Sequence, residues 1–347
     1  MVPAGAAGAE RKEALFYKKL AGKNKLVKCE LCPWRCTIAD GKTGYCHVRM
    51  NFDGVLRSLV YGLPVSIAID PIEKKPLFHF APGTRCLSIA TVGCNLRCKF
   101  CQNYTISQEY GAINGEEMSP EEVVALAKSY GVEGLSYTYT EPTVFYEYAL
   151  DIMKLAKKEG FYNMWVSNGY TNPEPIRRMA KYLDAVNVDL KGNDEFYRKV
   201  CGGIGIKPVF DALKAYVKNK VWVEVTNLII PGYNDSDKEI ANLAVWVRDN
   251  LGKATPLHFS AFHPQYKLTN APATPAATLE KAVKIAKAKG MRWVYAGNVW
   301  GNRYESTWCW KCGSLVIKRA GFDVVSFWKK CGKCGEKVDL KGMEFVK

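Results

Sequence analysis

Three closely spaced cysteines are the residues with the clearest potential for chemistry. Cys94, Cys98 and Cys101 form a C-x3-C-x2-C pattern directly after the apolar run Leu87–Val92. Cysteine thiolates are the usual ligands of iron–sulfur clusters, and a cubane with four irons normally takes four of them. Because no fourth cysteine is close by, one iron would lack a protein ligand and could bind a small chelating molecule. The alternative is a structural zinc or redox cluster site.

The triplet, defined as Cys94, Cys98 and Cys101, resembles the signature of the radical S-adenosylmethionine (SAM) superfamily. Aromatic Phe100 stands just before the third cysteine, as it does in that signature. The resemblance implies that the triplet is catalytic, holds a 4Fe–4S cluster and leaves one iron for SAM, with Phe100 as a cofactor-binding candidate. It also implies one-electron cleavage of SAM to methionine and a 5′-deoxyadenosyl radical, which abstracts hydrogen from a substrate.

From Leu87 onward, strand-like runs alternate with helix-like patterns. This alternation predicts an α/β fold with a parallel sheet and right-handed crossovers, and the resemblance implies a partial (β/α)6 radical-SAM barrel at residues 83–304. A cysteine-rich metal-binding region with its connector is predicted at 1–82, and a zinc-ribbon-like segment at 305–347. The predicted strands are Leu87–Val92, Leu135–Tyr139, Asn163–Ser167, Ala185–Leu190, Val221–Ile229, Leu257–Phe262 and Trp293–Ala296.

Helix boundaries are indicated by capping patterns between these runs. Capping boxes are predicted at residues 119–122 and 236–239, and a further helix is predicted from Thr274-Pro275 to Gly290. Lysines and apolar residues interleaved over residues 10–28 predict an amphipathic helix before the first cysteines.

A carboxylate follows the second predicted strand, at Glu141. In parallel α/β folds, binding and catalytic residues lie mostly at the carboxyl ends of the strands. In radical SAM enzymes a Gly-Gly-Glu-type motif at this place binds the amino group of SAM, which makes Glu141 a cofactor-binding candidate. Tyr139 and Thr140 replace the two glycines. A helix N-terminal carboxylate is the structural alternative, and the two roles are compatible.

Polar residues also follow the later strands. Ser167-Asn168-Gly169, Asp189-Leu-Lys191, Ile230-Pro231-Gly232 and His263 resemble the strand ends of the pyruvate formate-lyase activating enzymes and their relatives. That resemblance makes cofactor-binding candidates of Ser167, Asn168, Asp189, Lys191 and His263. The activating enzymes carry an aspartate that helps to hold a monovalent cation near SAM, whereas this chain has Val166 there, so the pattern leaves open whether a cation sits beside SAM.

Two further cysteine sets flank the predicted barrel. The N-terminal set is Cys29, Cys32, Cys36 and Cys46, and its spacing fits either a zinc ion or a second 4Fe–4S cluster. The C-terminal set is Cys309, Cys312, Cys331 and Cys334, in a C-x2-C-x18-C-x2-C pattern with a glycine after each pair. That pattern favours a zinc ribbon over an iron site. Across the chain, from about Cys29 to Cys334, the motifs look most like those of the AmmeMemoRadiSam-system enzymes.

Composition limits the classes of protein. The 13 cysteines fall mostly in metal-type clusters, which predicts a reducing, cytoplasmic location, and no apolar run suggests a membrane span. The net charge of +15 fits either an anionic partner such as nucleic acid or a solvated lysine-rich surface. A buried or surface role is expected for His79 rather than metal ligation.

Three functions are compatible with these patterns. The first is a radical SAM enzyme reduced by a protein such as ferredoxin or flavodoxin, acting on an unidentified protein or small-molecule substrate, with glycyl-radical-activase-like protein modification as one form. The second directs the same chemistry at RNA. The third is a non-catalytic multi-metal binding module, in which Cys86 or Cys201 would complete the ligands at the triplet.

Overall fold

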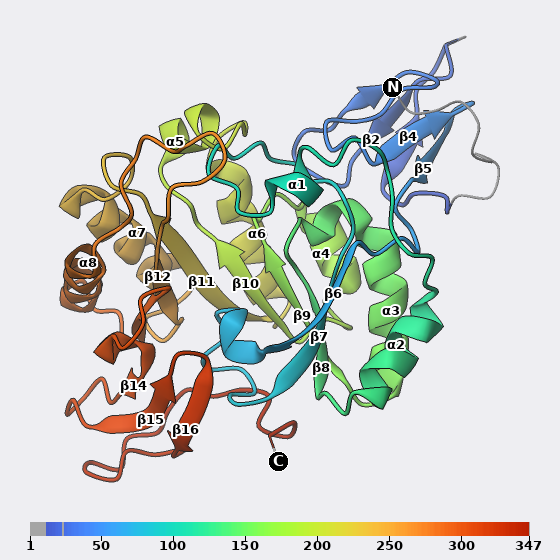
Figure 1. The fold of residues 1–347 in the computed structure, drawn as a ribbon. Helices are drawn as coiled ribbons and strands as arrows, with labels where there is room; N and C mark the ends of the chain where they lie inside the picture. Colours follow the sequence, from blue (N-terminus) through green and yellow to red (C-terminus); the bar gives the residue numbers. More distant parts are fainter. Residues whose placement is uncertain (1–11, 23, 347) are drawn as a thin grey trace.

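An eight-stranded main sheet forms the centre of the computed structural model, which describes residues 12–22 and 24–346 (Figure 1). Each strand from β7 to β13 lies parallel to the next in sequence, whereas β6 (Ser66–Pro71) pairs antiparallel with β7 at the edge. All the strands predicted after residue 83 are present, with boundaries within two residues. They are β7 Arg85–Ala90, β8 Gly134–Tyr137, β9 Tyr162–Ser167, β10 Ala185–Asp189, β11 Trp222–Ile229, β12 Leu257–Ala261 and β13 Val294–Gly297.

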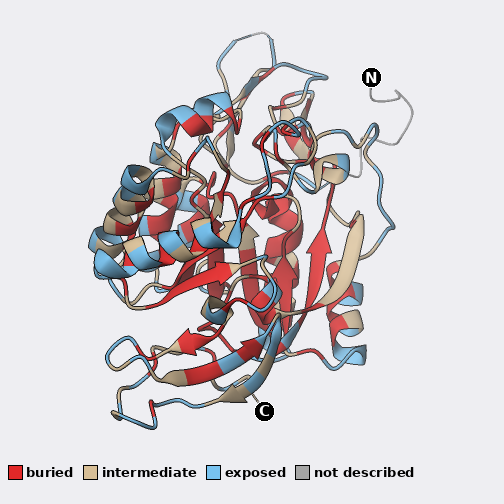
Figure 2. Ribbon diagram, turned by 60° about the vertical axis from the view of Figure 1, so that its left-hand side comes forward, coloured by how far each residue is buried: buried red, intermediate tan, exposed pale blue. Residues whose placement is uncertain are grey.

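Helices follow the parallel strands and cover the outer face of the main sheet (Figure 1). Their apolar sides and the strands between them form the buried core, while their outer sides are exposed (Figure 2). The fold is therefore of the α/β class with a mostly parallel sheet. The helices are α1 Tyr104–Ser107, α2 Pro120–Ser129, α3 Tyr146–Lys158, α4 Pro173–Met179, α5 Asp194–Lys199, α6 Lys207–Lys218, α7 Asp237–Asn250 and α8 Ala276–Ala288, with short 3-10 turns η1 Ile72–Lys74, η2 Pro142–Phe145 and η3 Arg303–Glu305.

The predicted capping signals are confirmed in one case and half confirmed in the other. Ser119 and Glu122 form the full reciprocal box at the start of α2. At α7, Ser236 accepts a hydrogen bond from the Glu239 N–H, but the Glu239 carboxylate contacts the Ser236 hydroxyl instead of its backbone N–H. The second box is therefore incomplete, and the other Glu239 carboxylate oxygen accepts from the Asn193 side-chain amide.

The helix predicted over residues 10–28 is wrong for the described part of that range. Phe16 and Lys25 have φ values of 55° and 49°, which an α-helix does not allow. The chain instead forms a three-stranded antiparallel sheet, in which hydrogen bonds between successive strands replace those of a helix. Its strands are β1 Tyr17–Lys19, β2 Val27–Cys29 and β3 Thr37–Ile38.

Two small cysteine-bearing modules lie at opposite ends of the main sheet (Figure 1). The N-terminal module comprises β1–β3 and the hairpin of β4 (Arg49–Phe52) and β5 (Val55–Ser58). It contacts the loops after the strands, where the Asn172 side chain donates to the Cys32 carbonyl at 3.0 Å. The C-terminal module comprises β14 (Thr307–Trp308), β15 (Leu315–Ala320) and β16 (Asp323–Phe327).

The C-terminal module contacts the opposite end of the main sheet, where its strands begin. The indole N–H of Trp293, just before β13, donates to Asp339 at 2.8 Å. His79 is fully buried, as expected, between the Asp339 carbonyl and the Tyr295 hydroxyl. Over the residues that the structure describes, no helix combines the length and apolar character needed to cross a membrane.

Candidate active site

The triplet occupies the loop that follows β7, at the carboxyl end of the main sheet. The Cys94 thiol accepts from the Leu96 N–H at 3.4 Å, and the Cys101 thiol contacts the Ser107 hydroxyl at 3.2 Å. Among described residues, no three potential ligands here have donor atoms all within 4.8 Å of one another. A tetrahedral zinc ion holds its sulfurs only about 3.8 Å apart, as its Zn–S bonds of about 2.3 Å require. The spacing fits a cluster, in which each thiolate binds a different iron.

The triplet thiols are held in their neutral form when no metal is bound. Burial raises the pKa of Cys94 and of Cys101. Contact with Cys201, followed by burial, raises the pKa of Cys98. Metal binding must therefore displace protons from these thiols, so that iron loading becomes more favourable as pH rises.

Glu141 lies beside the triplet and is almost fully buried, at 1% exposure. One carboxylate oxygen accepts from the N–H and hydroxyl of Thr143 and from the Ser167 hydroxyl, and the other accepts from the Asn168 N–H at 2.8 Å. Burial raises its pKa. The structural alternative for Glu141 is thus confirmed, since it caps η2, while its second oxygen retains a free acceptor position.

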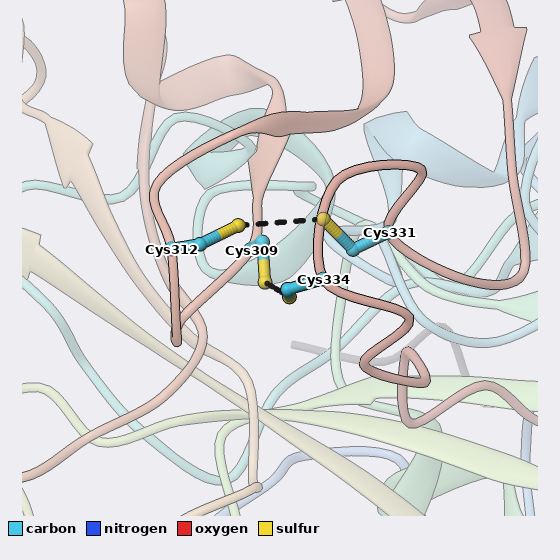
Figure 3. Close-up of side chains that lie close together, drawn as sticks. All are labelled: Cys309, Cys312, Cys331 and Cys334. Atoms are coloured by element: carbon cyan, nitrogen blue, oxygen red, sulfur yellow. Dashed lines mark hydrogen bonds between the residues drawn. The ribbon is translucent and has the colours of Figure 1, made fainter.

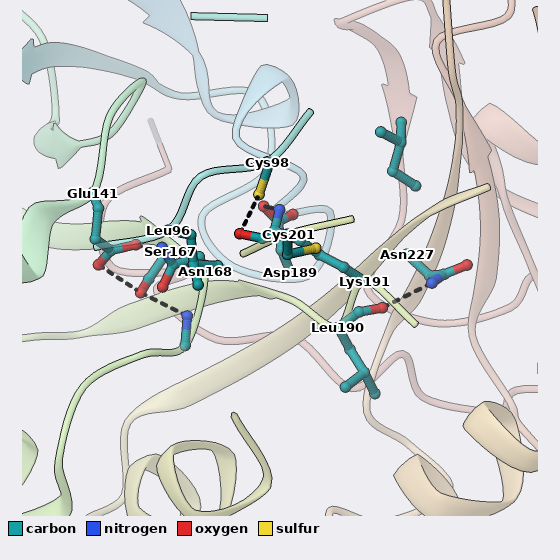
Figure 4. Close-up of polar contacts among 12 residues, drawn as sticks. Leu96, Cys98, Glu141, Ser167, Asn168, Asp189, Leu190, Lys191, Cys201 and Asn227 are labelled. Atoms are coloured by element: carbon teal, nitrogen blue, oxygen red, sulfur yellow. Dashed lines mark hydrogen bonds and ion pairs between the residues drawn. The ribbon is translucent and has the colours of Figure 1, made fainter. Parts of the chain in front are cut away.

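Asn168 joins this carboxylate to the cysteines. Its side-chain amide donates to the Cys94 thiol at 3.6 Å and to Asn95 at 2.9 Å. The predicted candidates Glu141, Ser167 and Asn168 therefore form one connected group next to Cys94 (Figure 4).

Asp189 and Lys191 form a second group, at the end of β10. Their side chains make an ion pair of 2.6 Å, and Lys191 lies over the Phe100 ring at 5.7 Å. Burial opposes the charge of Lys191, but the Asp189 carboxylate raises its pKa well above the usual value. Figure 4 shows Cys98 between this pair and the Glu141 group. His263 is exposed in the loop after β12, and no described contact joins it to the other candidates.

The two remaining cysteines lie in different places. Cys86 sits at the start of β7, the end of that strand opposite the triplet, and its thiol contacts the Asp70 carbonyl. Cys201 is fully buried, and its carbonyl accepts from the Cys98 thiol at 4.0 Å. Position therefore excludes Cys86 as a ligand at the triplet, and leaves Cys201 beside Cys98.

Sequence reasoning missed two residues that hold the site together. Asn95 is fully buried and donates from its amide to the Tyr170 carbonyl at 2.8 Å. The Arg97 guanidinium donates to the Cys94 carbonyl at 2.7 Å and to the Tyr45 carbonyl. Both residues lie inside the triplet motif, and that position was the only signal in the sequence. Their partners Tyr170 and Tyr45 lie 75 and 52 residues away.

The C-terminal set has a different geometry. The sulfurs of Cys309 and Cys334 lie 3.6 Å apart and those of Cys312 and Cys331 lie 3.4 Å apart (Figure 3). All four lie within 4.8 Å of one another, which is the spacing of ligands around one metal ion.

Comparisons with known proteins show which proteins this chain resembles. The model of the radical SAM superfamily matches residues 88–244. An uncharacterized protein of Methanocaldococcus jannaschii is 48% identical over 95% of this chain and 99% of its own length. The pyruvate formate-lyase-activating enzyme of Clostridium pasteurianum is 28% identical over 56% of this chain and 82% of its own length. A radical SAM methyltransferase structure from Sphaerobacter thermophilus aligns with a TM-score of 0.48 at 20% identity, over 62% of this chain and 67% of that one.

The chain belongs to the radical SAM superfamily. It is accordingly an enzyme of radical SAM chemistry, with pyruvate formate-lyase activating enzymes among its relatives. Membership implies a 4Fe–4S cluster and SAM as cofactors. The C-terminal set is arranged so that it could bind a metal ion.

Proposed function

We propose that this protein cleaves SAM reductively at a 4Fe–4S cluster held by Cys94, Cys98 and Cys101. The resulting 5′-deoxyadenosyl radical would abstract hydrogen from a substrate, and protein modification of the glycyl-radical-activase type is the substrate class we favour. Pyruvate formate-lyase activating enzymes of Clostridium pasteurianum and Escherichia coli among the relatives support that class.

One observation carries the proposal. Polar side chains from the ends of three neighbouring strands converge on a triplet whose sulfurs are too far apart for one metal ion. Glu141 follows β8, Asn168 follows β9 and Lys191 follows β10. A site that only stapled the fold would need no such polar groups beside its ligands.

The residues present fit the cofactors by their chemistry. The free acceptor position of Glu141 suits a protonated amino group, and Lys191 suits a carboxylate. Asp189 can accept hydrogen bonds from ribose hydroxyls, and Phe100 supplies an apolar wall beside Lys191. When bound, the cluster would supply one electron to the sulfonium of SAM. The surrounding burial would exclude water from the radical.

The test is anaerobic reconstitution with iron, sulfide and reductant, followed by chromatography for 5′-deoxyadenosine. We expect the wild type to form it from SAM and Cys98→Ala to form none. The matched control is Cys86→Ala, a buried cysteine at the far end of β7, which should behave as the wild type. Cluster-loaded wild type that makes no 5′-deoxyadenosine would overturn the proposal.

Cys201 decides between this proposal and a purely structural triplet. If Cys201 filled the fourth position of the cluster, Cys201→Ser would change the cluster spectrum and SAM would not perturb it. We expect instead that SAM alters the electron paramagnetic resonance spectrum of the reduced wild type. The same shift should occur in Cys201→Ser.

RNA modification is a second candidate, supported by exposed aromatic side chains on or next to the basic C-terminal module. Trp300, Trp310 and Trp328 are 80%, 41% and 55% exposed. Aromatic and basic groups together suit single-stranded RNA, but the module lies at the opposite end of the main sheet from the triplet (Figure 1). RNA binding that weakens steeply with salt, and that disappears without residues 305–347, would favour this candidate.

Several finer assignments belong to the same proposal. We propose zinc for the C-terminal set, ferredoxin or flavodoxin as the reductant, and the division into 1–82, 83–304 and 305–347. The first of these three regions, residues 1–82, includes β6, which pairs with the main sheet. A partial (β/α)6 barrel is the form of the main sheet that we propose.

A further inference from the structure

The four cysteines of the N-terminal set surround a cavity and do not meet at one point. All four line the same cavity. Among the described residues, only the C-terminal set brings three or more potential ligand atoms within 4.8 Å of one another. Since one zinc ion requires sulfurs about 3.8 Å apart, the N-terminal arrangement is too wide for a single ion.

A buried arginine on the wall of this cavity has a hydrogen-bond donor to spare. Arg49 is 2% exposed and uses one terminal nitrogen for both oxygens of Glu147 and the other for the Leu15 carbonyl. Its Nε is buried without a partner. Buried donors are normally satisfied, and a metal-bound thiolate or sulfide in the cavity would supply a charged acceptor.

The cavity is closed by the main body of the protein. Thr143 and Val144, from η2 beside Glu141, complete its wall. A group in this cavity would therefore sit within the fold rather than on a detached ribbon.

Short contacts connect the N-terminal set to the triplet. The Tyr45 N–H donates to the Cys36 thiol at 3.4 Å, and the Tyr45 carbonyl accepts from Arg97. Arg97 also donates to the Cys94 carbonyl at 2.7 Å. Trp34 stacks on Tyr45 with ring centroids 3.9 Å apart and donates to the Asn95 carbonyl. Two residues, Tyr45 and Arg97, thus bridge a ligand of one set and a ligand of the other.

We infer that Cys29, Cys32, Cys36 and Cys46 hold a second 4Fe–4S cluster, which relays electrons to the cluster of the triplet. Four thiolates leave no open iron, so this cluster cannot bind SAM. A low-potential one-electron donor protein reduces it from the 2+ to the 1+ state. It returns to 2+ when it passes that electron to the triplet cluster, and no bond is made or broken at the N-terminal set. The relay rests on the proposed function, whereas the presence of the cluster does not.

The metal content of anaerobically reconstituted full-length protein tests the cluster first. We expect about eight iron, about eight sulfide and about one zinc per chain, with the zinc in the C-terminal set. About four iron and about two zinc would overturn the inference. This measurement uses the unmodified protein, so it does not depend on whether a variant folds.

Variants then assign the iron to its site. Cys98→Ala should keep about four iron and an electron paramagnetic resonance signal after reduction with dithionite, and adding Cys32→Ala should remove both. Cys86→Ala is the matched control and should keep both clusters. If Cys98→Ala retains its iron while the wild type makes no 5′-deoxyadenosine, the proposed function fails and the second cluster stands. If Cys98→Ala loses all its iron, the second cluster is refuted.

The relay is tested by comparing two reductants. Cys32→Ala should lower 5′-deoxyadenosine formation about tenfold or more with reduced ferredoxin or flavodoxin. With dithionite, a small reductant that can reach the triplet directly, the loss should be about twofold or less. Equal losses with both reductants, in protein whose circular dichroism matches the wild type, would overturn the relay.

Discussion

The two cysteine-rich modules are built alike and placed oppositely. Each contains a three-stranded antiparallel sheet and four cysteines, and each is joined to the rest of the protein by a buried arginine–glutamate pair. Arg49 pairs with Glu147 at 2.9 Å in the N-terminal module, and Arg319 pairs with Glu73 at 3.4 Å in the C-terminal module. The N-terminal module lies beside the triplet, and the C-terminal module lies at the amino end of the main sheet (Figure 1).

The difference lies in what completes each site. In the C-terminal module, Gly313 and Gly335 close two matching turns, in which each glycine N–H donates to the carbonyl of the first cysteine of its pair at 2.9 Å. The two turns face each other, and their four sulfurs lie at single-ion spacing. The N-terminal set needs Thr143 and Val144 from another part of the chain to enclose its cavity. A metal site at the end of the main sheet away from the triplet suits a structural role. A site closed by Thr143 and Val144, beside Glu141, can exchange electrons with the triplet.

The largest expected effects come from breaking each buried ion pair. Arg49→Met and Arg319→Met each leave a buried glutamate unpaired, and we expect each to lower the free energy of unfolding by about 3–5 kcal/mol. Urea unfolding measures this loss. Only Arg49→Met should also change the iron–sulfur absorption spectrum and lower 5′-deoxyadenosine formation by folded protein.

The control for Arg49 is a variant that removes both partners. Arg49→Met combined with Glu147→Leu should recover part of the lost stability, because no buried charge is left alone. If Arg319→Met reduces 5′-deoxyadenosine formation as much as Arg49→Met under conditions where both are folded, the contrast between the modules is wrong.

A glycine tests how closely the N-terminal module must approach the triplet. Gly93 precedes Cys94 with φ of 100°, and a Cβ there would lie 2.6 Å from a Val48 methyl group. Gly93→Ala should therefore cost about 2–4 kcal/mol, from backbone strain and overpacking, and should weaken cluster binding. Gly252→Ala is the matched control, since Gly252 has φ of 111° and nothing within 4 Å. A loss for Gly93→Ala no larger than for Gly252→Ala would contradict this packing.

Acid should loosen the C-terminal side of the molecule. Burial lowers the pKa of His79 to about 4, and its ring contacts the Tyr295 hydroxyl and the Asp339 carbonyl, with the Glu224 carboxylate nearby. The unfolded chain binds this proton near pH 6.5, so it holds more protons than the folded protein between about pH 6.5 and 4. Proton uptake by His79 in the unfolded chain should lower the free energy of unfolding by about 1–2 kcal/mol between pH 7 and pH 5. His79→Gln should remove that part of the pH dependence, as thermal unfolding at several pH values would show.

The smallest expected effect is at the contact between Trp34 and Asn95. Trp34→Phe keeps an aromatic ring against Tyr45 but loses the hydrogen bond to the Asn95 carbonyl, which should cost about 0.5–1.5 kcal/mol. Iron content should be unchanged. Trp308→Phe, which loses a comparable bond to the Arg303 carbonyl in the C-terminal module, is the control. Both losses are measured by urea unfolding, and a loss of iron in Trp34→Phe alone would show that this contact supports the cluster.

Local patterns in the sequence predicted the parts of this protein that depend on near neighbours. The strands after residue 83 were located by apolar runs, because burial on both faces of a parallel sheet demands continuous apolar residues. The C-terminal set was predicted by its spacing, since each cysteine pair lies on one short turn closed by a glycine N–H. The roles of the triplet and of the polar strand ends were predicted from their resemblance to radical SAM enzymes.

Tertiary structure alone decided the rest. The segment before Cys29 has the residue pattern of a helix, yet it forms β1 and β2, which pair with each other and with β3, and its Ala14 N–H donates to the Leu56 carbonyl of β5. The spare donor of Arg49, and the Tyr45–Arg97 bridge from Cys36 to Cys94, depend on contacts between residues tens of positions apart. Spacing along the chain determines which atoms come close where the chain turns locally. Which sites face each other depends on long-range packing, because the whole buried core sets the relative positions of distant segments.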